Sequence, residues 1–182
     1  MQTPSCVCVL ACLLPAVARA QDGIDSISVP PRRAYQHSLS IVAQYDPSQG
    51  KTVIQIEPFP LDSLVSLSTL AALDGPRPRT PASSVVLTFW SRAPAGRYAS
   101  NRSVHVVLDG TVVLDLGNAW VTPQPKQGYG EVLLKSLSLG KLLAMANASA
   151  VVIRLGASSF TLTDSQHQGL RDFASRLAPE SR

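Results

Sequence analysis

Every cysteine of this chain lies at its very start, inside an apolar run that precedes the rest of the sequence. Residues 5–18 are almost continuously apolar, and residues 18–20 (Ala-Arg-Ala) match the small-x-small site of a signal peptidase. The run has about 14 residues, fewer than the roughly 20 that span a membrane as a helix. We therefore predict a signal peptide over residues 1–20, cleaved after Ala20. The alternatives are an uncleaved anchor and a lipoprotein acylated at Cys12.

Cleavage would leave a chain of 162 residues (182 minus 20) that begins at Gln21 and contains no cysteine. A disulfide framework, thiolate catalysis and a zinc site built on cysteine are thereby excluded from the mature protein. A domain of about 150 residues buries about 70% of its unfolded surface, so a hydrophobic core alone can stabilise it. The leader and a composition rich in alanine, leucine and arginine together predict a bacterial periplasmic or secreted protein.

The chain carries a mild positive charge, +4 with the leader and about +3 once Arg19 is removed. This excess is too small to predict nucleic-acid binding. No stretch after the leader is long enough to predict a membrane-spanning helix, and no motif predicts a cofactor. Residues 21–37 contain two adjacent prolines and predict an irregular N-terminal arm, which leaves residues 38–178 as a single β-rich domain.

Alternation of apolar and polar residues with a period of two predicts that most of this domain consists of strands. Residues 38–44 and 51–57 alternate on either side of the turn residues 46–50, which predicts a β-hairpin. Further strands are predicted at residues 84–91, 103–108, 111–116, 128–136, 150–155 and 159–162.

The dipeptide Asp109-Gly110 is the strongest short hairpin signal in the sequence. A two-residue turn at this point pairs Leu108 with Thr111 and His105 with Leu114. Both faces of the resulting hairpin are apolar, so we predict that other parts of the structure cover each of them.

The stretch of residues 61–73 is ambiguous. Its leucines at 64, 67 and 70 have helical spacing and Asp62 suits an N-cap, so a short helix is the preferred prediction. The serines and Val65 in the same stretch leave an extended conformation as the alternative.

Two helices are predicted in the last third of the chain. Ser138 caps a short helix whose leucines at positions 139, 142 and 143 share one face with Ala146. Thr163 and Gln166 form the capping box of a final helix over residues 164–177.

The final helix is amphipathic. Asp172 can pair with Arg176 on its polar side, and His167 is expected to be solvated. The residues expected to pack on the sheet are Leu170, Phe173, Ala174 and Leu177. The fold class is therefore α+β, mainly antiparallel β (sandwich-like or a sheet covered by helix) with a C-terminal amphipathic helix.

Catalytic and metal-binding motifs are weak. Residues 50–52 (Gly-Lys-Thr) lack the earlier glycine and the following helix of a phosphate-binding loop. Residues 138–141 fit the S-x-x-K pattern of penicillin-recognising enzymes, but the companion motifs are absent. The histidines at 37, 105 and 167 do not have the spacing of metal ligands, so no metal or catalytic residue is assigned.

His105 nevertheless supports an alternative function, because it lies on an apolar strand face shortly before Asp109. The alternative is a small periplasmic hydrolase that uses His105. It requires an acid and a hydroxyl group beside the imidazole in a pocket.

Arginine and aromatic residues gather at the end of strand 84–91 and in the loop that follows. The candidate binding residues are Trp90, Arg92, Arg97, Tyr98 and Arg102. Such side chains are frequent anchors of binding patches, and guanidinium groups recognise carboxylates and phosphates. We therefore expect an exported, non-enzymatic binding or envelope-associated domain that contacts a protein, an anionic glycan or a lipid headgroup. Self-assembly into a homo-oligomer is a third hypothesis.

Overall fold

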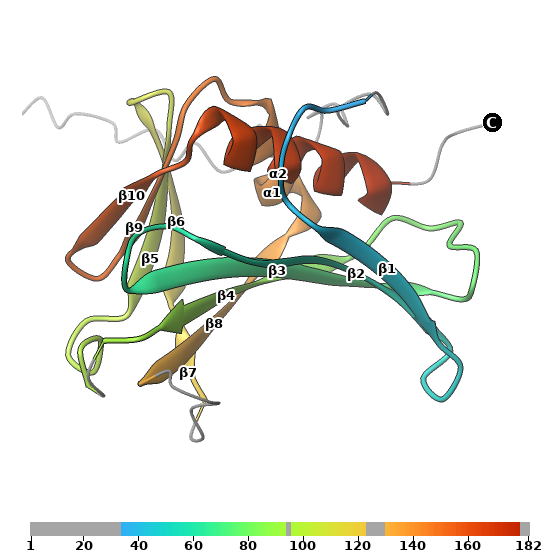
Figure 1. Cartoon of the computed structure of the whole chain (residues 1–182), viewed down its shortest axis with the longest axis horizontal. Helices are drawn as coiled ribbons and strands as arrows, with labels where there is room; N and C mark the ends of the chain where they lie inside the picture. Colours follow the sequence, from blue (N-terminus) through green and yellow to red (C-terminus); the bar gives the residue numbers. More distant parts are fainter. Residues whose placement is uncertain (1–33, 94–95, 123–129, 179–182) are drawn as a thin grey trace, which may run out of the picture.

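The computed structural model describes residues 34–93, 96–122 and 130–178, which form two antiparallel sheets and two helices (Figure 1). The predicted signal peptide, and the predicted arm up to residue 33, lie outside the described residues. The strands are β1 (Ile41–Asp46), β2 (Lys51–Pro60), β3 (Val65–Asp74), β4 (Ser84–Ser91), β5 (Ser103–Leu108), β6 (Val112–Asn118), β7 (Trp120–Val121), β8 (Glu131–Ser138), β9 (Val151–Leu155) and β10 (Ser158–Thr161). The helices are α1 (Leu139–Asn147) and α2 (Asp164–Leu177).

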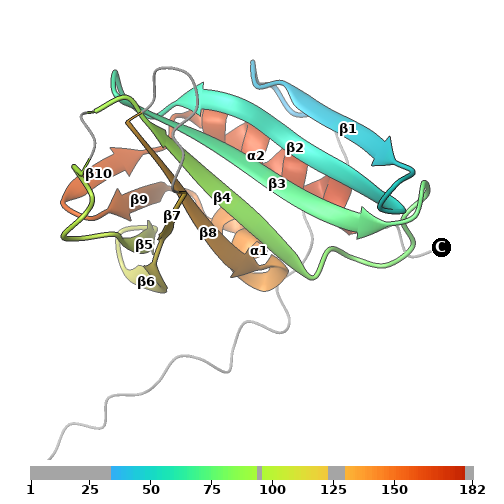
Figure 2. The same ribbon diagram turned by 90° about the horizontal axis from the view of Figure 1, so that it is seen from below.

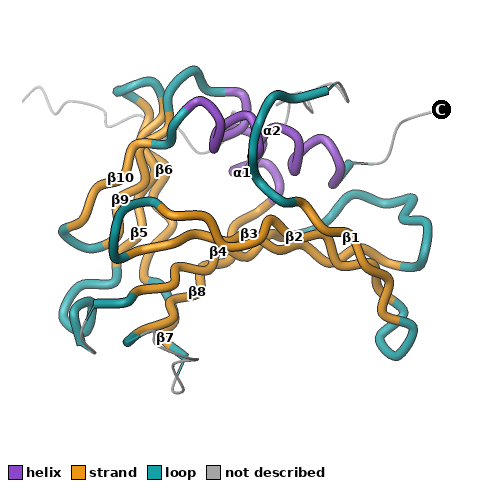
Figure 3. Tube along the Cα trace, in the orientation of Figure 1, coloured by secondary structure: helices purple, strands orange, loops and turns teal. Residues whose placement is uncertain are grey.

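The two sheets differ in size and position. The large sheet has the strand order β1-β2-β3-β4-β8-β7, and the small sheet has the order β10-β9-β5-β6. Both helices lie over one face of the large sheet, and the small sheet stands at one end of it (Figures 1 and 3). The predicted α+β class is confirmed, in the form of a mainly antiparallel structure with a C-terminal helix.

The hydrophobic core fills the space between the large sheet, the two helices and the small sheet. Phe89 of β4 and Phe173 of α2 are fully buried in it, as is Ile153 of the small sheet. Leu142 and Met145 of α1 are fully buried as well. One core therefore joins all the layers into a single unit.

The preferred helix at residues 61–73 is wrong, because residues 65–73 belong to strand β3 and residues 61–64 form the turn before it. Its residues at 65, 67, 69, 71 and 73 are all buried, which is the period of a strand and not of a helix. Asp62 caps a tight turn and not a helix: its Oδ1 accepts the backbone N–H groups of Leu64 and Val65. Leu64, assigned to the helical stripe, is 40% exposed.

The Asp109-Gly110 hairpin is confirmed, but its predicted register is wrong by one residue. Leu108 faces Val112 and not Thr111, since Thr111 stays outside the ladder and donates its N–H to the carbonyl of Leu108. The Asp109 side chain also ties the turn to a distant segment, because its Oδ1 accepts the N–H groups of residues 149 and 150, just before β9.

The changed register determines which side chains leave the core. Val106 now faces Leu114 in the core, while His105 faces Asp115 on the opposite side. Val112 and Val113 are 53% and 56% exposed, so the prediction that both faces of the hairpin are covered is wrong at β6.

The two predicted helices are confirmed, including their caps. Ser138 Oγ accepts the N–H of Lys141 at the start of α1, and Thr163 with Gln166 forms the capping box of α2. The predicted apolar stripe of α2 is buried. The prediction of a solvated His167 is wrong, since that residue is only 7% exposed.

Candidate functional site

The candidate binding residues of the sequence fall into two groups. Arg92, Arg97, Tyr98 and Arg102 belong to the connection between β4 and β5, which we call the arginine loop (residues 92–102, of which 94 and 95 are not described). Trp90 lies within β4 and on the face of the large sheet that points away from the helices. The candidates therefore come from one strand and from the loop that directly follows it.

Hydrogen bonds to a buried carboxylate hold the arginine loop on the large sheet. Glu131, at the start of β8, is 6% exposed and faces Ser91 at the end of β4. Its Oε1 accepts the N–H of Gly96 at 3.2 Å, and its Oε2 accepts the N–H of Tyr98 at 3.2 Å. A buried carboxylate is costly unless such donors satisfy it, so the loop and the carboxylate stabilise one another.

Tyr98 is the second anchor of the loop. Its side chain is 2% exposed and belongs to the core, and its hydroxyl lies 3.3 Å from Ser158 Oγ. Gly156, in the turn between β9 and β10, has a φ of +57°, and a Cβ there would lie 3.4 Å from Cδ1 of the Tyr98 ring. A Cβ at Gly156 would lie 2.6 Å from the carbonyl oxygen of Asn101. Tyr98 therefore positions the loop and does not itself face solvent.

The arginines of the loop are exposed to solvent. The guanidinium of Arg97 lies over the Tyr98 ring, 5.5 Å from its centroid, and its Nη2 donates to Ser158 Oγ at 3.4 Å. Arg102 is fixed through its backbone, since its carbonyl accepts the N–H of Ala119. Arg92 likewise donates its backbone N–H to the carbonyl of Leu64. The result is a basic surface on a fixed backbone.

The outward face of the large sheet carries both tryptophans of the chain. Trp90 is half-buried and donates its indole N–H to Ser68 Oγ at 2.9 Å. Trp120 lies on the edge strand β7 and is 73% exposed. Sequence reasoning missed Trp120 because a two-residue strand has no detectable alternation, and the only signal was a large aromatic residue outside any predicted element.

His105 lies on the outward face of the small sheet. Its Nδ1 is 3.5 Å from Asp115 Oδ1, and its other cross-strand neighbour is Arg154. Among the described residues, no hydroxyl is hydrogen-bonded to the imidazole, and the nearby Ser103 hydroxyl donates to Asn101 instead. The acid that a hydrolase requires is present beside His105, without a bonded nucleophile.

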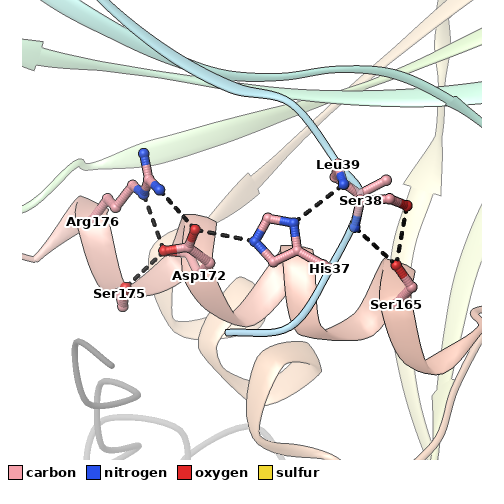
Figure 4. A network of polar contacts seen from close by, with 7 residues as sticks. All are labelled: His37, Ser38, Leu39, Ser165, Asp172, Ser175 and Arg176. Atoms are coloured by element: carbon pink, nitrogen blue, oxygen red, sulfur yellow. Dashed lines mark hydrogen bonds and ion pairs between the residues drawn. The ribbon is translucent and has the colours of Figure 1, made fainter. Parts of the chain in front are cut away.

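His37 takes part in a polar network with the final helix (Figure 4). Its Nε2 lies 3.1 Å from Asp172 Oδ2, and its Nδ1 accepts the N–H of Leu39, so both ring nitrogens are engaged. Burial alone would raise the pKa of the Asp172 carboxyl, but hydrogen bonds from Arg176 and His37 outweigh it and hold the pKa below its ordinary value. This network is a structural clamp.

His167 is a buried partner of α1. Its Nε2 lies 3.0 Å from the carbonyl oxygen of Met145, which identifies that nitrogen as the donor. Burial lowers the pKa of this imidazole below its ordinary value, in spite of the hydrogen bond to the carbonyl. The neutral imidazole therefore joins the two helices.

Membrane-spanning helices and metal-ligand clusters are both absent from the described residues. Over these ranges, no helix has the length and apolar character to cross a membrane. In the same part of the chain, no cluster of histidine, cysteine and acidic side chains has an arrangement that could hold a metal ion.

Comparison of the chain with protein-family models, with curated proteins and with solved structures gives no match.

Proposed function

We propose that this chain is a non-enzymatic, exported binding domain that recognises an anionic group through its arginine loop. The observation that carries the proposal is the buried Glu131 carboxylate, which fixes the loop by accepting the N–H groups of Gly96 and Tyr98. A charge placed in the interior is a costly way to hold a surface loop, and the loop that it holds displays arginine.

The fixed loop favours binding in two ways. Guanidinium groups make paired, charge-assisted hydrogen bonds to carboxylates, sulfates and phosphates. Contact with the Tyr98 ring and with Ser158 restricts the rotamers of Arg97 before any partner arrives, so less entropy is lost on binding. The partner class is a protein, an anionic glycan or a lipid headgroup, which share such an anionic group.

Export is part of the proposal and rests on the sequence. The apolar run and the small-x-small site within residues 1–20 support cleavage after Ala20 and release to the periplasm or the medium, in a bacterial host. A mature chain purified from its native host would then begin at Gln21. Intact mass measurement checks this, and soluble cytoplasmic protein that retains Met1 would contradict it.

The binding site is tested with two matched double variants. Arg97→Ala with Arg102→Ala removes two exposed guanidiniums of the loop, and Arg77→Ala with Arg79→Ala removes two exposed arginines elsewhere. Each protein is titrated with heparin, with vesicles that contain phosphatidylglycerol and with a polyglutamate peptide. These three probes distinguish a glycan, a lipid and a protein source of the anionic group.

We expect at least one probe to bind the wild type, and the loop variant to bind it about tenfold more weakly. The control variant should keep the wild-type affinity, and the melting temperature of both should be almost unchanged. Wild-type protein that binds none of the probes would reject the proposal. An equal loss in both variants would reject the loop as the site.

The contact between His105 and Asp115 favours the hydrolase as a second candidate. Its test is hydrolysis of chromogenic ester, phosphate and glycoside substrates by the wild type and by His105→Ala. Activity that disappears in the variant would support it. Activity that survives, or that is absent from the wild type, would remove His105 as a catalytic residue.

A further inference from the structure

The outer face of the small sheet carries three polar side chains in one row. Figure 2 shows the four strands of this sheet beside one another, in the order β10, β9, β5 and β6. His105 of β5 pairs with Arg154 of β9 on one side and with Asp115 of β6 on the other. Side chains of directly paired residues point to the same side of a sheet, with Cβ atoms about 5 Å apart. The register therefore sets a guanidinium, an imidazole and a carboxylate side by side, and we call these three groups the polar row.

The polar row is open to solvent. Ile153, the neighbour of Arg154 that points to the other side of the sheet, is completely buried in the core. Arg154 and Asp115 are exposed, and the side chain of His105 is 36% exposed. A small ligand can therefore reach all three groups without any movement of the core.

The guanidinium of Arg154 has no partner in the part of the chain that the structure describes, where it makes neither a hydrogen bond nor an ion pair. The carboxylate of the row, on Asp115, belongs to a strand roughly 10 Å away, with His105 in between. A guanidinium has five N–H donors in a planar fork that fits two oxygens of an anion. The row therefore offers a cation that an anion from solution can bind.

Asp115 influences what His105 can bind. Its Oδ1 lies 3.5 Å from Nδ1 of the imidazole, and its negative charge favours Nδ1 as the place of the proton in the neutral ring. Nε2 then carries a lone pair, and no described residue donates a hydrogen bond to it. Asp115 and Arg154 are the charged groups that the two neighbouring strands set beside the ring. The neutral imidazole therefore accepts a hydrogen bond at Nε2, and only the protonated imidazole donates one there.

An anion that carries its own proton suits both free groups. Hydrogen phosphate has oxygens that accept from the guanidinium and a hydroxyl that donates to Nε2 of the neutral imidazole. Sulfate has no proton near neutral pH, so it can contact Nε2 only after the imidazole has taken a proton from solution. Both oxygens of a carboxylate are used by the guanidinium fork. Phosphate monoesters lose their last proton at about pH 6, whereas inorganic phosphate keeps one at neutral pH.

We propose that the polar row binds inorganic phosphate, with Arg154 as the charged partner and His105 as the acceptor of the phosphate hydroxyl. Histidine side chains change charge between about pH 5 and 8. Sulfate therefore binds on the acidic side of this range alone, whereas phosphate binds on both sides. The polar row lies on β5, β6 and β9, apart from the arginine loop, so this inference does not depend on the proposed function.

The first measurement is a ¹⁵N NMR titration of the purified chain with phosphate and with sulfate, at constant ionic strength. Two charge-assisted hydrogen bonds on an open surface predict affinities in the millimolar range. At about pH 5.5 the two anions should bind equally to within about threefold, and at about pH 8 phosphate should bind about tenfold more tightly. The signals of residues 105 and 154 should shift. No saturation by about 100 mM phosphate, or sulfate that binds as tightly as phosphate at the higher pH, would overturn the proposal.

Two variants assign the contacts. Arg154→Gln removes the charge and should weaken phosphate binding about tenfold at both pH values. His105→Gln keeps a side chain that donates and accepts hydrogen bonds but does not titrate, so phosphate and sulfate should bind this variant equally at both pH values. The matched control is Arg97→Ala with Arg102→Ala, which removes two exposed guanidiniums of the arginine loop and should keep the wild-type affinity for phosphate.

Three results would each overturn the site: an unchanged phosphate affinity in Arg154→Gln, a pH-dependent preference for phosphate that persists in His105→Gln, or a loss of phosphate binding in the control. Both side chains lie outside the core, so the variants should fold, which circular dichroism checks. If Arg154→Gln does not fold, Arg154→Lys replaces it. This variant keeps the charge without the planar fork and should bind phosphate more weakly than the wild type.

Discussion

Nε2 of His37 lies 3.1 Å from Oδ2 of Asp172, which joins the segment before β1 to the final helix across 135 positions of sequence. Two neighbouring contacts extend this junction. Ser38 donates its N–H to Ser165 Oγ at 3.2 Å, and Leu39 lies against Gly169. We call residues 34–40 the strap, since they cross α2 and lead into the edge of the large sheet (Figure 4).

The first prediction concerns the carboxylate of the strap junction. Asp172→Asn should lower the free energy of unfolding at pH 7 by about 1–3 kcal/mol, because Arg176 and His37 lose a charged acceptor. The pKa of Asp172 is lowered by folding, so its contribution is present above its ordinary pKa of 3.8 and is lost as the pH falls through the folded value. The difference between wild type and variant in urea denaturation should therefore shrink at pH 3. A difference that is constant with pH would contradict this.

The second prediction concerns the crossing point of the strap. A Cβ at Gly169 would lie 2.5 Å from Leu39 Cδ1 and 3.2 Å from Leu39 Cβ, so Gly169→Ala forces the Leu39 side chain to shift. We expect the free energy of unfolding to fall by about 1 kcal/mol. This is the net effect, because alanine favours the helix over glycine by a similar amount and offsets part of the cost of the clash. Leu39→Ala should make room for the new methyl group. The double variant should therefore be more stable than the sum of the two single changes in unfolding free energy predicts. If the changes in unfolding free energy are additive, the two residues do not meet.

The third prediction is a pH dependence due to His167. The folded imidazole has a lowered pKa, while the unfolded chain binds a proton near the ordinary value of 6.5. The unfolded state therefore binds more protons below pH 6.5, and stability falls as the pH decreases from about 7 toward the folded pKa. His167→Gln can keep a donor to the Met145 carbonyl and should show a weaker decline between pH 7.5 and 5.5. If the free energy of unfolding changes with pH in the same way for wild type and His167→Gln, this assignment is wrong.

The fourth prediction compares two threonines of the core. Thr69 is fully buried, and among the described residues its hydroxyl has no hydrogen-bond partner, while Thr52 Oγ1 donates to the carbonyl of Gly75 at 2.6 Å. Thr69→Val should raise the free energy of unfolding by about 1 kcal/mol, because it removes an unsatisfied polar group. Thr52→Val should lower the free energy by a similar amount. If both substitutions change the free energy of unfolding in the same direction, the two hydroxyl groups do not differ in hydrogen bonding as described.

Local signals in the sequence predicted the elements that local interactions determine. The capping box of Thr163 with Gln166 and the cap at Ser138 lie within one helical turn, and both are confirmed. The hairpin at Asp109-Gly110 is also confirmed, but its register differs by one residue from the prediction, and Asp109 bonds to the distant residues 149 and 150. Such distant partners are invisible in a local pattern.

The errors have the same physical origin. The leucines of β3 fit both a helical and an extended pattern, and pairing with β2 and β4 decides between them. His167 has a polar side chain, but α1 covers it and supplies a carbonyl acceptor.

The candidate site could be predicted only in part. Its arginines were visible as a cluster in the sequence, while the roles of Glu131 and Tyr98 depend on backbone N–H groups and on the turn at Gly156, which only the fold brings close. Neither residue stands in a pattern that marks it as an anchor. The exposed Trp120 likewise became significant only when the sheet showed which face it shares with Trp90.

The central claim is that the arginine loop is a preformed binding site. The most direct measurement is a ¹⁵N NMR titration of the protein with the anionic probe that binds best. We predict that the amide signals of residues 96–102, and of Ser158 beneath Arg97, shift with the probe, while those of residues 77–79 remain in place. Shifts that are spread over all basic surfaces, or confined to a region outside the loop, would contradict the claim.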